Sequence, residues 1–121
     1  MMHTYDYNER RKHQRIEVVK AIFIEVIRPG SRRESENTIV RCETVDISVS
    51  GLRIHVPEHI PQGSKLNIAV PMEDWVENLE LVGEAKWVKP VEAGAGFWVG
   101  LELRDSSHEH MKQWFKVVHS L

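Results

Sequence analysis

The sequence lacks the residues that build covalently or metal-supported scaffolds. It has a single cysteine, Cys42, so it can form no internal disulfide and no cysteine-rich zinc site. No apolar run approaches the roughly 18–20 residues that a membrane-spanning helix needs. Residues 1–15 are polar and contain no apolar core of a secretory signal. We therefore expect a cytoplasmic protein.

The sequence also lacks the short motifs of common enzymes. It contains no Walker A loop, no GxSxG nucleophile turn and no HExxH zinc motif. His108 and His110 fall on different faces of an expected helix and have no third ligand nearby, so we predict no metal site. Neither a cofactor nor an enzymatic activity is expected.

The composition that remains is that of one globular domain with a locally basic start. The 121 residues are 41% hydrophobic and 28% charged, values that suit a single buried core. The 16 Lys and Arg residues are outweighed by 18 Asp and Glu residues, giving a formal charge of −2. Four of these basic residues lie within RRKHQR, residues 10–15. The net charge argues against a long polyanion as the ligand.

Hydrophobic residues alternate with polar ones after residue 15, and turn signals separate the runs. We expect strands at residues 16–28, 38–45, 52–56, 65–71, 79–90 and 96–103, with the last two joined as a hairpin. In the fifth, Leu79, Leu81, Ala85 and Trp87 are expected to share one face. Short strands at this spacing indicate an antiparallel barrel or sandwich.

The final segment has the period of a helix. Ser106 and Glu109 form a capping-box pattern, and the predicted apolar face contains Met111, Trp114, Phe115 and Val118. A helix over about residues 106–119 is expected to lie on the barrel. The chain thus divides into a flexible tail, residues 1–15, and a domain over residues 16–121.

Two motifs in this arrangement resemble those of the PilZ domain, a family of bacterial receptors for the second messenger cyclic di-GMP. Arg11-x-x-x-Arg15 precedes the first strand, and Asp46-x-Ser48-x-x-Gly51 lies at the turn between the second and third strands. Each motif alone is weak, but their order and spacing together are specific. The resemblance implies a six-stranded antiparallel β-barrel with a C-terminal helix.

The chemistry of the motifs suits a guanine dinucleotide. An Arg guanidinium offers two parallel donors to a phosphate or to the O6 and N7 atoms of guanine, and each good fork is worth about 1–3 kcal/mol. Asp46 can accept from the N1–H and N2–H₂ groups of guanine, and Ser48 supplies a hydroxyl. Gly51 permits close approach of the backbone. The resemblance assigns ligand binding to Arg11, Arg15, Asp46, Ser48 and Gly51.

The resemblance extends to two further residues. Arg10 stands where an Arg accompanies binding of two stacked ligand molecules, which favours an intercalated dimer of cyclic di-GMP. Trp87 is similar to an aromatic residue that lies beside a guanine in some members. Its place on an apolar face equally allows burial in the core, and we leave both interpretations open.

The expected function is that of a cyclic di-GMP receptor and adaptor. Ligand binding would order the tail and change the surface offered to a partner protein in motility, biofilm or secretion control. One alternative is a PilZ-fold interaction domain that binds no nucleotide. Another is a small nucleic-acid-binding barrel, which the net charge disfavours, so no nucleic acid is expected as a partner.

Overall fold

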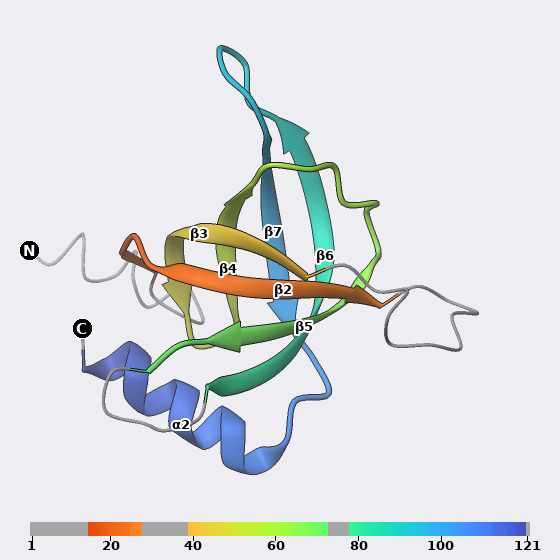
Figure 1. Ribbon diagram of the computed structural model, residues 1–121. Coiled ribbons are helices and arrows are strands. Elements are labelled where there is room, and N and C mark those ends of the chain that lie inside the picture. Colours follow the sequence, from red (N-terminus) through yellow and green to blue (C-terminus); the bar gives the residue numbers. More distant parts are fainter. Residues whose placement is uncertain (1–14, 28–38, 73–77, 121) are drawn as a thin grey trace, which may run out of the picture.

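Residues 15–27, 39–72 and 78–120, the part of the chain that the computed structural model describes, form a β-barrel with a helix across one end (Figure 1). The elements are β1 (Ile16–Glu17), β2 (Ala21–Ile27), β3 (Ile39–Ser48), β4 (Gly51–Val56), β5 (Lys65–Val70), β6 (Leu79–Pro90), β7 (Phe97–Leu103) and α2 (His108–His119). All paired strands are antiparallel, in the order β1-β3-β2-β5-β6-β7-β4, and pairing of β3 with β4 closes the ring. The predicted six-stranded barrel with a C-terminal helix is confirmed, and β1 is one strand more.

The strand expected over residues 16–28 is split into β1 and β2. Between them Val18, Val19 and Lys20 lie opposite only Thr44 and Val45 of β3, so the ladder cannot continue without a break. The Thr44 hydroxyl fills this break: it accepts from the Lys20 amide at 2.8 Å and donates to the Val18 carbonyl at 2.5 Å. The extra residue explains why one periodic run became two strands.

The turn expected over residues 46–51 is much shorter than predicted. β3 continues through Ser48, and Ser48 pairs directly with Gly51, so only Val49 and Ser50 make the turn. Asp46 and Ser48 therefore lie on a strand end. Strand geometry fixes the direction of their side chains.

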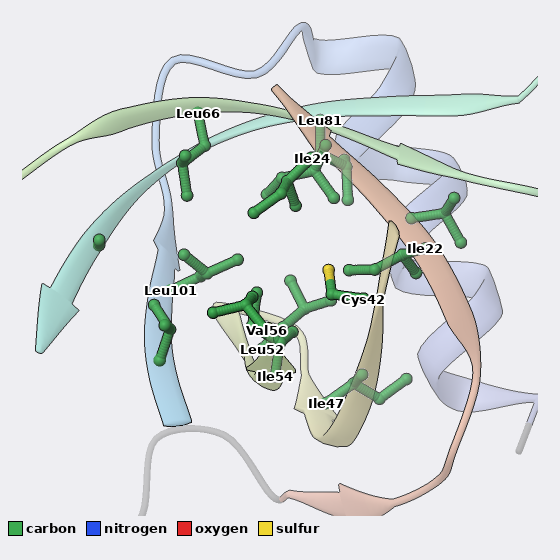
Figure 2. Close-up of a cluster of buried hydrophobic side chains, with 14 of the residues drawn as sticks. Ile22, Ile24, Cys42, Ile47, Leu52, Ile54, Val56, Leu66, Leu81 and Leu101 are labelled. Atoms are coloured by element: carbon green, nitrogen blue, oxygen red, sulfur yellow. The ribbon is translucent and has the colours of Figure 1, made fainter. Parts of the chain in front are cut away.

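The interior of the barrel is filled by aliphatic side chains from all six strands. Figure 2 shows these side chains pointing toward one another, including Ile22, Ile54, Leu66 and Leu101. Cys42 is part of this core, and burial raises the pKa of its thiol to about 12. The thiol therefore stays protonated near neutral pH and acts as a small apolar group.

α2 begins one residue later than the capping pattern suggested. Its N-cap is Ser107, whose side chain accepts from the His110 amide. The Ser106 hydroxyl instead bonds to the backbone N–H and C=O of Val82 on β6. Among the described residues, no helix is both long and apolar enough to cross a membrane.

The buried face of α2 is narrower than predicted. Trp114 and Val118 are 1% and 3% exposed, whereas Phe115 is 50% exposed and lies beside the His119 ring. Phe115 is about 100° around the helix axis from Trp114, which takes it out of the seam that faces the barrel. The prediction that Phe115 packs in the core is therefore wrong.

Gly51 is required for the close packing of β4 against β7. A Cβ atom at this position would lie 2.2 Å from the carbonyl oxygen of Leu101. We expect Gly51→Ala to lower the free energy of unfolding by about 1–3 kcal/mol, measured by urea titration, because a backbone must move. Gly94→Ala is the control, since its Cβ would meet only Val91 at 3.4 Å. Equal stability of the two variants would contradict this account.

Candidate functional site

One row of residues crosses four neighbouring strands on the outer face of the barrel. Asp46 of β3 pairs with Arg53 of β4, which pairs with Gly100 of β7, which pairs with Trp87 of β6. Directly paired residues point to the same face of a sheet. The row therefore joins the DxSxxG motif to Trp87 across the surface of the barrel.

Asp46 is the centre of this row and is held by two guanidinium groups. Arg15 Nε donates to Oδ1 at 2.6 Å, and Arg53 Nε donates to Oδ1 and Oδ2 at 3.0 and 2.7 Å. Arg53 Nη2 also donates to Oδ2. The Asp46 side chain is only 3% exposed. Two cations and one buried anion thus form a fixed cluster on the outside of β3 and β4.

The Asp46 carboxyl remains ionised because its partners outweigh its burial. Burial alone would raise its pKa, but hydrogen bonds from Arg53 and Arg15 hold the pKa below its ordinary value. The same pairing raises the pKa of Arg53, with the hydrogen bond to Asp46 as the main cause and the charge of Glu17 as a minor one. Asp46 and Arg53 therefore keep their charges across the physiological range of pH.

Ser48 links this cluster to the helix. Its hydroxyl accepts from Arg15 Nη1 at 3.4 Å, and its carbonyl accepts from the indole Nε1–H of Trp114 at 3.0 Å. The Ser48 side chain is fully buried. The end of β3, which carries Asp46 and Ser48, is therefore held by a hydrogen bond from α2.

Trp87 lies on the outer face, not on the face of Leu79, Leu81 and Ala85 as predicted. A β-bulge between Ala85 and Trp87 shifts the register by one residue and so reverses the side-chain direction. The indole rests on Gly100: a Cβ there would lie 2.2 Å from the Trp87 Nε1 atom. Lys89 Nζ lies 5.5 Å from the ring centroid. The Trp87 ring thus lies against Gly100, on the same face as the cluster.

Among the predicted site residues, Arg15 is in direct contact with both Asp46 and Ser48. Gly51 is the residue of β4 that pairs with Ser48. Trp87 joins them through the cross-strand row. Arg10 and Arg11 lie outside the described residues.

Arg53 was not predicted as a site residue. Arg53 is exposed between the buried residues Leu52 and Ile54 of β4, and the pairing of β3 with β4 sets it beside Asp46. Within residues 15–27, 39–72 and 78–120, no three His, Cys, Asp or Glu side chains are placed to hold a metal ion.

Comparisons with known proteins bear on the family and the fold of this chain. The PilZ domain family model matches residues 9–116, whereas curated protein sequences give no match. Among solved structures, the c-di-GMP-bound PilZ domain of YcgR from Escherichia coli has a TM-score of 0.66 at 17% identity, covering 93% of this chain and 91% of that one.

Two other solved structures share the fold. MotI/DgrA, an inhibitor of motility from Bacillus subtilis, has a TM-score of 0.65 at 14% identity; the match covers 92% of this chain and 50% of that one. The PilZ domain of CeSA from a cellulose-synthesising bacterium has a TM-score of 0.55 at 17% identity, covering 88% and 96%. This chain therefore spans half the length of MotI/DgrA. With the family model matched over nearly its whole length, the chain belongs to the PilZ domain family.

Proposed function

We propose that this protein is a cytoplasmic receptor for cyclic di-GMP that acts as an adaptor. The observation that carries the proposal is the contact of Arg15, the last residue of RxxxR, with Asp46 and Ser48 of DxSxxG. The two motifs are therefore already joined, at the point where the N-terminal segment reaches the barrel. The structure of a YcgR PilZ domain with c-di-GMP supports this choice of ligand.

The surface offers the groups that a cyclic dinucleotide needs. Guanidinium forks can bind its two phosphates or the edges of its guanines, and Arg11 lies four residues before Arg15. Trp87 is half-buried, and a base could stack on its ring in place of the Lys89 ammonium; such stacking is worth about 1–3 kcal/mol per base. With Arg10 as an additional cation, we propose an intercalated pair of ligands.

We assign Asp46 a different role from the guanine contact expected from the sequence. Its two carboxylate oxygens already accept four hydrogen bonds from Arg15 and Arg53. A carboxylate has about four acceptor sites. Asp46 therefore orders the guanidinium groups that meet the ligand, and replacing them by guanine donors would sacrifice charge-assisted bonds.

Signalling in this proposal depends on the segment that carries Arg10 and Arg11. Closure of these side chains over a ligand on the outer face of the barrel would fix that segment beside β1. The resulting surface, formed jointly by protein and ligand, would then bind a partner protein. The regulated process, whether motility, biofilm or secretion, depends on that partner.

Titration calorimetry with cyclic di-GMP tests the proposal. We expect saturable binding with a stoichiometry of about two, and a loss of about tenfold or more in affinity for Arg11→Ala, because one fork is removed. Arg41→Ala is the matched control, since Arg41 is an exposed residue of β3 that pairs with Phe23 of β2.

The possible outcomes are separable. Absence of binding by the folded wild type would refute the receptor function and favour an interaction domain that binds no nucleotide. A stoichiometry near one would refute only the role given to Arg10.

A further inference from the structure

Arg53 lies where a ligand on this surface would contact it. It is on the outer face of β4, between Asp46 on one side and Gly100 on the other. Its side chain is 47% exposed, against 3% for Asp46. Exposed ion pairs stabilise proteins little. The Arg53–Asp46 pair differs from them, because its carboxylate is buried.

The hydrogen bonds to Asp46 fix the plane of the Arg53 guanidinium and leave one edge of it available. Asp46 accepts from Nε and Nη2, which form the side edge of the group. A guanidinium has five N–H donors in one plane, so the terminal edge, with one N–H from each Nη atom, still presents a two-pronged fork. Within residues 15–27, 39–72 and 78–120, Asp46 is the acceptor for the Arg53 side chain, and its hydrogen bonds leave the terminal fork free to meet a ligand.

An aromatic ring lies on the other side of Gly100 from Arg53. Gly100 pairs with both Arg53 and Trp87, and the Trp87 indole lies directly on it. A base that stacks on this ring and extends across Gly100 would be flanked by Arg53, which lies on β4, two strands away from Trp87. Two donors beside an aromatic face suit a purine with two acceptors on one edge, which guanine has in O6 and N7. Adenine would present an amino donor there and be rejected.

We propose that Arg53 is a specificity-determining residue that binds the O6 and N7 atoms of a guanine stacked on Trp87. The inference rests on the proposed binding of cyclic di-GMP and adds the residue that distinguishes guanine from other bases. It makes β4 a direct contributor to the site, beyond the residues of the two motifs.

A chemical double-mutant cycle tests the contact. Wild type and Arg53→Lys are titrated with cyclic di-GMP and with its 7-deaza analogue, in which a C–H group replaces N7. Lysine keeps a cation beside Asp46 but lacks the planar fork. We expect Arg53→Lys and the 7-deaza change each to weaken binding about tenfold, and their combination to weaken it little further, because both remove one interaction.

The controls separate this inference from the proposed function. Arg41→Lys makes the same substitution at an exposed site on β3, so its effect and that of the 7-deaza change should simply add. Additive losses for Arg53→Lys, with an unchanged melting temperature, would overturn the inference while leaving the receptor function intact. No binding of cyclic di-GMP by wild type would overturn both.

Discussion

Trp114→Ala is expected to lower the free energy of unfolding by about 3–5 kcal/mol, the range for removal of a buried large aromatic side chain. Trp114 is the largest of the fully buried side chains and is 1% exposed. It packs α2 against the barrel, where it lines a small, mostly apolar hollow with Ile47 and Leu52. Urea unfolding followed by circular dichroism measures the loss.

Part of this loss is a hydrogen bond and can be measured separately. Trp114→Phe keeps an aromatic ring in the core but removes the Nε1–H donor to the Ser48 carbonyl. A buried acceptor left without its partner costs about 1–3 kcal/mol, so we expect an intermediate stability. Phe115→Ala is the matched control on the adjacent, 50% exposed position. A Trp114→Ala variant no less stable than Phe115→Ala would contradict the role given to the helix.

The consequence for the site follows from the same bond. Ser48 is the residue through which Arg15 and Trp114 are connected, one through its hydroxyl and the other through its carbonyl. Loss of Trp114 therefore removes a support of the strand end that contacts Arg15, a residue of the proposed ligand site. The helix stabilises the site as well as the barrel.

Alternation of apolar residues was sufficient to predict an antiparallel barrel or sandwich, because the runs from β4 to β7 bury nearly every second side chain; the resemblance to PilZ domains favoured the barrel. It failed for Trp87, since a bulge after Ala85 adds a residue that no period-two pattern can show. The split between β1 and β2 has a similar origin: an uneven count of residues on paired strands, visible only once the partner strand is known.

Only part of the candidate site could be predicted from the sequence, and the missing part has a related reason. Motif spacing identified Arg15, Asp46 and Ser48, which the structure joins by hydrogen bonds. Arg53 was missed because its role depends on cross-strand pairing with Asp46, and pairing partners are not written in the order of the residues. Period-two alternation fixes a face of a strand, whereas register fixes the neighbour.

The second large effect on stability concerns Arg53 and its cluster with Asp46 and Arg15. Replacing Arg15 and Arg53 together by alanine is expected to lower the free energy of unfolding at neutral pH by about 3–5 kcal/mol, because it leaves a buried carboxylate without a cation. Arg15 and Arg53 have 29% and 47% exposed side chains, whereas Asp46 has 3%. The penalty therefore arises from the buried anion that remains.

Removal of that anion should reverse most of the effect. In the triple variant Arg15→Ala, Arg53→Ala and Asp46→Ala, no charge stays buried, and replacing both partners of an interaction by apolar groups is nearly neutral. The double variant Arg41→Ala and Arg104→Ala removes the same net charge from exposed positions and serves as the control. If the triple variant is as unstable as the double variant Arg15→Ala and Arg53→Ala, packing and not charge causes the loss.

The dependence on pH gives the sharpest test, because its sign reverses. In the wild type the pKa of Asp46 is lowered, so the cluster stabilises the fold above the ordinary pKa of about 3.9 and loses that contribution as the pH falls further. Without the two Arg residues, burial would dominate and raise the pKa of Asp46. Stability of the variant should then fall as the pH rises above about 4, where the wild type has gained its full contribution. The difference in free energy of unfolding between the wild type and this variant should be largest near neutral pH and should shrink toward pH of about 3. A difference that does not depend on pH would show that Asp46 is not the buried charge that Arg15 and Arg53 stabilise.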